Sequence, residues 1–299
     1  MLKRIGESFF KVYNKVDLSP YDYRPKPLRP IYGVYHIFCD VGWEAIVERQ
    51  LSTLRQSGLL EASRRLYVSA IVKSEDDVLK LKSIFGQDPI EIVSCVQNPK
   101  CYEYPALEFV RKICQREDCY VYYFHTKGIS YQTLHTNDRA FLSFKRKILA
   151  WCEMMEYFCF SKWQVAVNVL MSGYDTYGCY RWPPKPARFT MYSGSFWWAT
   201  SEHIRLLPPF DDAVIANDRF YSEIWLYQRE VKDFSAFDTI ADLYFVRIPR
   251  SLYADVKPCR WAVARFVLTY NWRKLLKHAF GYSYKQHCQR KFQRLKQNF

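Results

Sequence analysis

The sequence predicts an α/β protein with a central, mostly parallel sheet flanked by helices. Through the first 125 residues, short runs of β-branched and aromatic residues alternate with stretches of helical period, which is typical of βαβ units. At 299 residues the chain can bury a sizeable core. Apolar residues make up 49% of it and charged residues 25%, as in ordinary globular domains.

The strands and helices can be followed in order along the first half. Each predicted strand is rich in β-formers, and each predicted helix repeats apolar residues every three or four positions. Gly58 favours a helix end, and Pro105 stands in a first helical turn, where proline is tolerated. The predicted strands are residues 31–38, 66–72, 90–96 and 120–125, and the predicted helices are residues 43–57, 75–84 and 104–115.

The second half is less regular and contains no internal repeat. Residues 138–169 have a broad apolar face and predict one or two long helices. Beyond them we expect a short strand at 174–180, a proline-rich loop at 181–188, an apolar and aromatic segment at 189–200, helices at 201–207 and 217–230, and a last strand at 243–248.

Composition divides the chain into three parts: a proline-rich lead-in at 1–30, the α/β domain at 31–256, and a basic amphipathic C-terminal extension at 257–299. Eleven of the 44 Lys and Arg residues lie in this extension, which has no Asp or Glu. The rest of the chain is therefore close to neutral. A positive field concentrated in one segment favours an anionic partner, such as lipid headgroups, nucleic acid or an acidic protein.

Within the extension, residues 261–280 space apolar side chains as a helix does, with Arg and Lys between them. Such a helix fits the headgroup layer of an anionic membrane, although its apolar face fits packing on the domain almost equally well. The residues after 282 carry five more cations, and we expect them to bury little.

The ten cysteines are irregularly spaced, with no Cys-x-x-Cys and no zinc-ligand spacing, so we expect free thiols in a reducing compartment. The N-terminus lacks the apolar stretch of a signal peptide, and no apolar run is long enough to cross a bilayer. We expect a cytoplasmic protein that lies peripherally on the inner face of the plasma membrane.

The strand at 120–125 ends in His125, Thr126, Lys127 and Gly128. Ligands of parallel sheets bind beyond the carboxyl ends of strands. At such an end Lys127 would supply a positive point charge, and His125 would supply a hydrogen-bond donor or a proton relay. Gly128 would let the backbone approach closely, so the segment suits a bound diphosphate. The alternative is an ordinary turn with a surface lysine and a half-buried histidine.

The strand at 31–38 ends near His36, Asp40 and Trp43. By the same argument these side chains fit a base or ribose, although His36 fits a core position equally well.

A third candidate segment contains Ser193, Gly194 and Ser195, followed by Trp197 and Trp198. Small residues beside Gly194 allow a ligand to approach the backbone, and the indoles offer a stacking wall for a sugar. For each tryptophan alone, a core position is the simpler interpretation.

The predicted helix at 217–230 carries Asp218, Arg219 and Glu223. Arg219 and Glu223 stand four residues apart, which suits an exposed ion pair next to an acceptor pocket. Alternatively Glu223, or else Asp218, is a general base that deprotonates an acceptor hydroxyl.

These segments together resemble a family of bacterial polysaccharide-biosynthesis glycosyltransferases and glycosyltransferase-like proteins. Its members carry a strand ending in His-Thr-Lys-Gly, then Gly-x-Phe-Trp-Trp-Ala, then Asp-Arg-x-x-x-Glu. The resemblance covers residues 31–227, with FHTKG at 124–128, SGSFWWATSEHIRLLP at 193–208, NDRFYSEIW at 217–225, YHIFCDVGW at 35–43 and SGLL at 57–60.

The resemblance implies a GT-A-like fold and a glycosyltransferase. Such an enzyme would move a sugar from a nucleotide-sugar donor to a glycan or lipid-linked acceptor in surface polysaccharide biosynthesis. Typical GT-A enzymes hold a divalent metal through Asp-x-Asp, which this chain lacks; His125 to Lys127 stand in its place. A lysine can neutralise the leaving diphosphate, so the sequence assigns no cofactor and leaves Mg²⁺ or Mn²⁺ open.

Two other functions compete with this one. The basic extension and the aromatic content of 18% favour a nucleic-acid-binding protein, but the near-neutral body and the lack of an RNA-binding aromatic signature argue against nucleic acid. The other is a catalytically inactive, glycosyltransferase-like scaffold.

Overall fold

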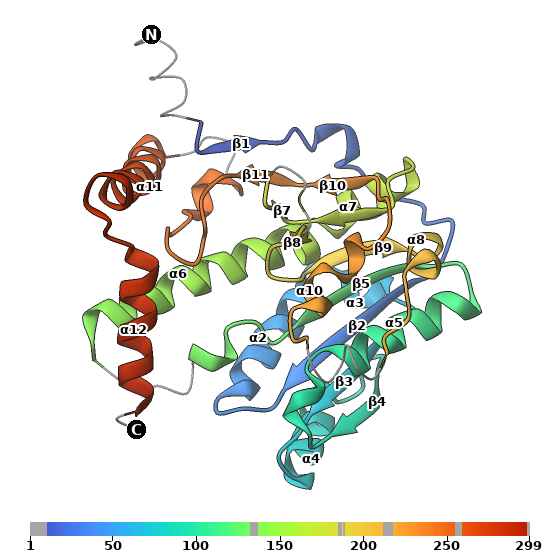
Figure 1. The fold of residues 1–299 in the computed structure, drawn as a ribbon. Coiled ribbons are helices and arrows are strands. Elements are labelled where there is room, and N and C mark those ends of the chain that lie inside the picture. Colours follow the sequence, from blue (N-terminus) through green and yellow to red (C-terminus); the bar gives the residue numbers. More distant parts are fainter. Residues whose placement is uncertain are drawn as a thin grey trace. The chain divides into compact units, whose positions relative to one another are not determined.

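The computed structural model describes residues 11–131, 137–184, 187, 189–211, 218–254 and 259–297 (Figure 1). The chain forms two compact units. The sheet unit comprises Asp17–Ile129 and Met155–Ala236, and the helical unit comprises the described residues of Met1–Val16, Ser130–Met154 and Phe237–Phe299. These limits differ from the boundaries at 30 and 256 expected from composition, because a change in charge along a chain need not coincide with a change in packing.

The sheet unit is built on seven strands in the order β10-β6-β9-β5-β2-β3-β4. Strands β4, β3, β2 and β5 run parallel, β9 is antiparallel to both β5 and β6, and β10 is parallel to β6. The predicted α/β fold with a mostly parallel central sheet is confirmed. The strands are β2 (Ile31–Phe38), β3 (Arg65–Ile71), β4 (Ile90–Val96), β5 (Tyr120–His125), β6 (Thr176–Gly178), β9 (Trp197–Thr200) and β10 (Asp233–Ser235).

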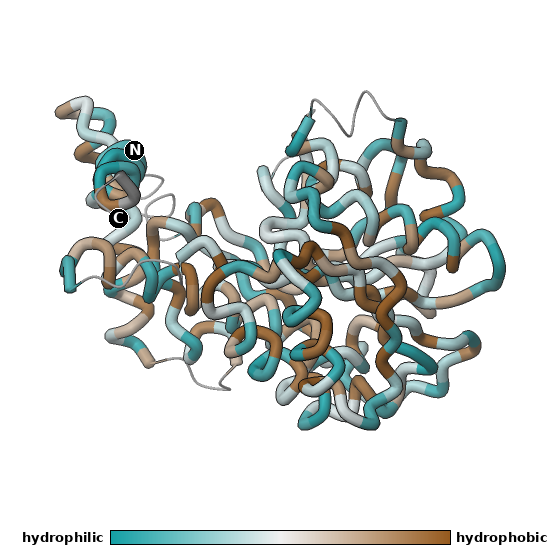
Figure 2. Tube along the Cα trace, turned by 90° about the horizontal axis from the view of Figure 1, so that it is seen from below, coloured by the Kyte–Doolittle hydropathy of each residue, from teal (hydrophilic) through white to brown (hydrophobic). Residues whose placement is uncertain are grey.

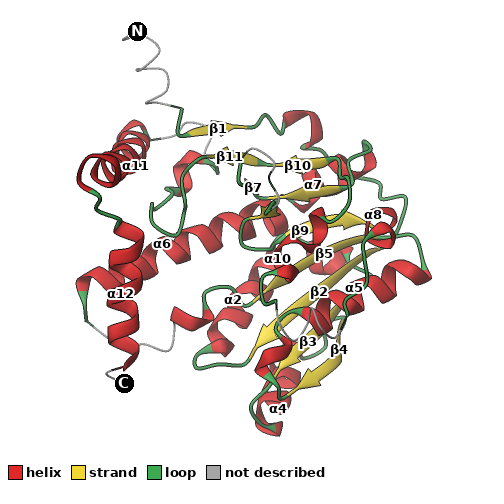
Figure 3. Cartoon of the chain, viewed as in Figure 1, coloured by secondary structure: helices red, strands yellow, loops and turns green. Residues whose placement is uncertain are grey.

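Helices cover both faces of this sheet (Figure 3). On one face, α5 and α8 pack with the strands in one buried cluster. On the other face, α2 and the π-helical turn Tyr157–Ser161 are anchored by hydrogen bonds from Tyr35 to Gln50 (2.5 Å) and from Trp198 to the carbonyl of Cys159 (2.9 Å). The helices are α2 (Trp43–Gln56), α3 (Leu59–Ala62), α4 (Glu75–Phe85), α5 (Tyr104–Arg116), α7 (Trp163–Met171), α8 (Ser201–Leu206) and α10 (Tyr221–Ile224).

The period of two in β5 decides which side chains reach which face. Tyr123 belongs to the α5 cluster and stacks on Trp197 at 5.1 Å, whereas Phe124 meets Phe160 on the opposite face at 4.8 Å. The buried residues of the central strands are mainly apolar and aromatic. Figure 2 shows the hydropathy of the residues along the chain. The aromatic excess of the sequence therefore serves mainly the core, and His125 falls on the same face as α5.

The helical unit pairs β1 (Tyr13–Lys15) with β11 (Phe237–Thr239) and contains most of α6 (Arg139–Glu156), all of α11 (Arg260–Phe280) and α12 (Tyr284–Gln297). Helices α6 and α7 confirm the helices expected at 138–169, and α11 confirms the basic helix. The expectation that residues after 282 bury little is confirmed for most of the described ones, which are exposed or half-buried, although Cys288 is buried and Phe292 of α12 stacks on Phe141 at 5.8 Å.

Four local predictions were wrong. Residues 243–248 form a turn, in which the Asp242 carboxylate accepts a hydrogen bond from the backbone of Tyr244 (3.1 Å). The helix expected at 217–230 is reduced to α10 and the 3-10 turn Trp225–Tyr227, and Asn217 lies outside the described residues. The expected lead-in and loop contain short strands: β1, and β7 (Arg181–Trp182) paired with β8 (Met191–Tyr192).

Within the described residues, no helix combines the length and apolarity needed to cross a bilayer.

Candidate functional site

The carboxyl ends of the parallel strands bring two predicted histidines together. His36 on β2 and His125 on β5 are register partners. Thr126 ties the two strand ends: its N–H donates to the carbonyl of His36 (3.1 Å), and its Oγ1 accepts from the N–H of Phe38 (3.0 Å). The hydroxyl of Thr126 thus has a structural partner, and its role toward a ligand stays a prediction.

The residue that sequence reasoning missed is Glu103, which directly precedes α5. Its Oε2 accepts a hydrogen bond from the hydroxyl of Tyr123 (2.8 Å), and its Oε1 lies 3.6 Å from Nδ1 of His125. Burial alone would raise the pKa of Glu103, but His125, His36, Lys127 and the Tyr123 hydroxyl together lower it. Glu103 is therefore an ionised carboxylate that faces both imidazoles.

A signal for Glu103 was present in the sequence. It stands between a predicted strand and a helix with proline in its first turn, and in a parallel sheet that connection lies at the carboxyl edge. Glu103 lies seven residues beyond the end of the predicted strand at 90–96, so the strand's last residues alone do not indicate it.

The hydrogen bonds of His125 define where it can take up a proton. Its Nε2 lies 3.0 Å from the carbonyl oxygen of Gly194, and because a carbonyl only accepts, Nε2 carries the hydrogen. In the neutral ring, Nδ1 then presents a lone pair toward Glu103. Burial lowers the pKa of His125, Glu103 opposes this, and Lys127 lowers the pKa further. His125 is neutral at neutral pH, and a proton taken up at Nδ1 would create an ion pair with Glu103.

His36 is only 4% exposed, and its Nδ1 has no hydrogen-bond partner among the described residues. Burial lowers the pKa of His36 to about 4. The negative charge of Glu103 opposes this shift, whereas repulsion from His125 adds to it. Buried polar atoms are nearly always hydrogen-bonded, so an open imidazole nitrogen at a strand's carboxyl end is typical of a functional position.

Lys127 and Glu223 complete the cluster. The pKa of Glu223 in α10 is raised, mainly because the side chain is buried and in part because Glu103 is nearby. The positive charges of Lys127 and Arg219 oppose this shift. Lys127 also lowers the pKa of Glu103, so its ammonium acts on two carboxylates at once. Two imidazoles, one ammonium and two carboxylates therefore converge from separate segments of the chain.

The glycine-containing segment aims a backbone carbonyl at this cluster. Gly194 (φ 89°) and Ser195 (φ 57°) both adopt left-handed conformations, and this turn presents the Gly194 carbonyl to His125. The N–H of Ser193 donates to the carbonyl of Tyr180 (3.0 Å). Trp197 and Trp198 are both buried, on opposite faces of the sheet, so their rings serve the core.

Asp218 and Arg219 lie just before α10. The Asp218 carboxylate accepts hydrogen bonds from the backbone N–H groups of Phe220 (2.8 Å) and Tyr221 (3.1 Å) and so holds the turn that leads into the short helix. Arg219 lies over the ring of Phe220, with 5.6 Å from its guanidinium carbon to the ring centroid. Because the helix begins at Tyr221, the expected helical spacing of Arg219 and Glu223 does not exist.

The remaining predicted residues lie at the same edge of the sheet. Asp40 pairs with Lys73, which follows β3, at 2.7 Å, and Gly128 has φ of 90°, a conformation that favours glycine. Among the residues described, no group of three or more His, Cys, Asp or Glu side chains has the arrangement of a metal site.

No family model and no curated protein sequence matches this chain. Among solved structures, 4-diphosphocytidyl-2C-methyl-D-erythritol synthase from Anaerococcus prevotii aligns at 8% identity and a TM-score of 0.35, over 80% of this chain and 97% of its own. The mannosyltransferase Ktr4p from S. cerevisiae aligns at 11% identity and a TM-score of 0.29, over 75% of this chain and 70% of its own. TM-scores this low carry no argument about chemistry, and the fold class rests on the sheet itself.

The buried histidines predict a loss of stability in acid. Between pH 6.5 and about 4 the unfolded chain holds a proton at His36 that the folded chain does not, so the free energy of unfolding falls as pH falls. His36 alone contributes a loss of about 3 kcal/mol over this window, and His125 acts in the same direction. Denaturant unfolding from pH 7.5 to 4 should show a shallower decline for His36→Gln than for wild type. The exposed His278→Gln is the control, and equal slopes in all three proteins would refute the assignment.

Proposed function

We propose that this chain is a transferase that moves a sugar from a nucleotide-sugar donor to a glycan or lipid-linked acceptor. The observation that carries the proposal is the cluster of His36, His125, Lys127, Glu103 and Glu223 at the carboxyl edge of a mostly parallel sheet, where such sheets bind ligands. The motif resemblance to polysaccharide-biosynthesis glycosyltransferases supports the same chemistry.

In this proposal Lys127 faces the donor diphosphate, with Gly128 allowing the phosphates to approach the backbone. His36 and Asp40 face the base and ribose, and Ser193 with Gly194 borders the sugar. Trp197 and Trp198 are left to the core because both are buried.

The reaction needs a base and a stabilised leaving group. Glu223 removes the proton from the acceptor hydroxyl, whose oxygen bonds to the anomeric carbon while the bond from that carbon to the diphosphate breaks. Burial raises the pKa of Glu223 and so makes it a stronger base than an exposed carboxylate. The electron pair of the broken bond stays on the diphosphate, which Lys127 stabilises.

Lys127→Ala should abolish most transfer and leave the fold intact. Loss of a cation aimed at a developing diphosphate costs on the order of 3 kcal/mol, or about a hundredfold in rate. Lys80→Ala in α4, which removes an exposed lysine paired with Glu44, is the matched control. The measurement is release of nucleoside diphosphate from a panel of nucleotide sugars. Activity of a folded Lys127→Ala within threefold of wild type would end this role.

Glu223→Gln should lower turnover by about a hundredfold or more, because a positioned base contributes ~10²–10⁴ in rate. Donor affinity should change less than threefold, since the base acts on the acceptor. Asp218→Asn is the matched variant, because an Asn side-chain oxygen can still accept the hydrogen bonds from the N–H groups of Phe220 and Tyr221. Turnover and a nucleotide titration, measured on both variants, show which of the two carboxylates acts as the general base. Loss of turnover in Asp218→Asn alone would transfer the role to Asp218.

We also propose that the helical unit docks on an anionic membrane, which fits a lipid-linked acceptor. Helix α11 exposes large apolar side chains at helical spacing, among them Leu268 and Trp272, the latter 58% exposed. Arg and Lys residues lie between them, and residues 257–299 contain no acid. An exposed apolar stripe with flanking cations is complementary to a layer of anionic headgroups above acyl chains.

The double variant Leu268→Gln/Trp272→Gln should bind vesicles of phosphatidylserine and phosphatidylcholine at least tenfold more weakly than wild type in sedimentation. Binding of the wild type should weaken as salt rises, because the surface charge is screened. Leu79→Gln, at an exposed leucine of α4, is the control. Equal binding of the wild type to purely phosphatidylcholine vesicles would contradict an anionic surface as the partner.

A further inference from the structure

A second concentration of charge lies within the helical unit, around a cavity of about 530 Å³. Thirteen of the described residues line it, from α6, from the segment that leads into the 3-10 turn Arg250–Leu252 and the first residue of that turn, and from α11. No Asp or Glu is among them. Six are cations: Arg146, Lys147, Arg247, Arg250, Arg265 and Arg273.

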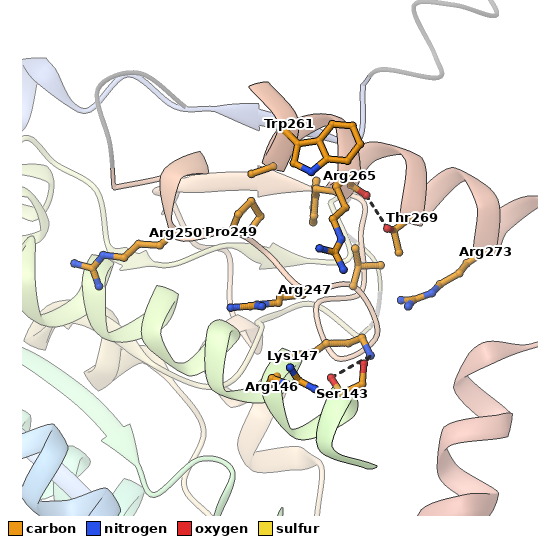
Figure 4. A pocket seen from close by; sticks show the side chains of 13 residues that line it. Ser143, Arg146, Lys147, Arg247, Pro249, Arg250, Trp261, Arg265, Thr269 and Arg273 are labelled. Carbon is orange, nitrogen blue, oxygen red and sulfur yellow. Dashed lines mark hydrogen bonds between the residues drawn. The ribbon is translucent and has the colours of Figure 1, made fainter. Parts of the chain in front are cut away.

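Figure 4 shows the cations that line the cavity, among which Arg250 points away from the others. Arg265 descends from α11 toward Arg247, and Arg273 points inward from the same helix. Lys147 comes from α6 on the opposite side, where its ammonium donates to Ser143 Oγ at 3.2 Å. Three separate segments therefore direct positive charge into one space.

Among the described residues that line the cavity, no carboxylate is present to neutralise this charge. Asp138 and Asp242 of the same unit form ion pairs with Lys291 and Lys285 of α12, which do not line the cavity. The Nη1 atom of Arg273 is buried and has no hydrogen-bond partner among the described residues.

Lys147 is itself buried, and the pKa of its ammonium group is lowered in part by the neighbouring positive charges. Burial lowers its pKa to about 8, and repulsion from Arg273 and Arg146 acts in the same direction, while Cys288 opposes it. Several cations facing one cavity repel one another, so a bound anion with several charges would stabilise the arrangement.

We propose that this cavity is a binding site for a compact polyanion of the phosphate class, either a diphosphate or a phosphate monoester. Guanidinium groups match phosphate oxygens with two parallel hydrogen bonds, and five of the six cations are arginines. A space of this size is typical of small-ligand sites. The proposal does not depend on the transferase proposal, because no residue of the sheet-edge cluster lines the cavity.

The test is titration of the full chain with inorganic pyrophosphate by calorimetry, with sulfate at equal ionic strength as the reference anion. Wild type should bind pyrophosphate saturably and at least tenfold more tightly than sulfate. Arg247→Gln/Arg265→Gln should weaken pyrophosphate binding at least tenfold. The matched control is Lys274→Gln/Lys277→Gln, which removes two exposed charges from α11 outside the cavity.

The control should bind within threefold of wild type. Equal losses in both double variants would mean a general effect of charge and would overturn the proposal, as would failure of wild type to bind pyrophosphate. Circular dichroism spectra of both variants should match that of the wild type.

A second experiment distinguishes the source of the phosphate. Displacement of pyrophosphate by phosphatidic acid vesicles, but not by phosphatidylserine vesicles, supports a lipid monoester; no displacement by either supports a soluble diphosphate.

Discussion

The ionised carboxylate of Glu103 is the constraint on which the carboxyl edge of the sheet depends. A largely buried charge is tolerated only when partners stabilise it, and here one hydroxyl and three cationic or protonatable groups do so. The period of two in β5 places Tyr123 and His125 on the same face, where both can reach Glu103. The parallel register then adds His36 beside His125. Glu103 thus interacts with both histidines and with Lys127, whereas burial is the largest influence on the pKa of each histidine.

The sequence was most informative where one physical rule acts alone. Runs of β-formers and a helical period located the parallel strands and α5, and the shared edge of parallel strands was enough to associate His36 with His125. Prediction failed where several structures share one pattern. Residues 243–248 are rich in apolar side chains, as a strand would be, yet they form a turn and bend in which Leu243, Phe245, Val246 and Ile248 are buried. The N–H groups of Tyr244, Phe245 and Val246 donate hydrogen bonds to Asp242. Glu103 contacts Tyr123 across 20 positions, a pairing that only the fold creates.

The positive charge of the C-terminal region belongs to a folded unit. Helix α12 is held by the ion pair of Lys291 with Asp138 at 2.8 Å, and the guanidinium of Arg273 lies 3.9 Å from the ring centroid of Tyr284. Removing these helices would therefore remove packing as well as charge. For this reason single side chains on α11, rather than truncations, separate binding of anions from stability of the fold.

The pairing of β1 with β11 has a consequence for how the protein is made. Thr239 donates a hydrogen bond to the carbonyl of Val12 at a separation of 227 positions, whereas the strands from β2 to β5 lie close together in sequence. At ~5–20 residues per second, a ribosome needs about 10 to 45 s to cover that separation. Throughout this interval β1 has emerged without its partner strand. A nascent chain would thus carry an open strand edge near its start, and this is the stage of biosynthesis at which chaperone contact would matter most.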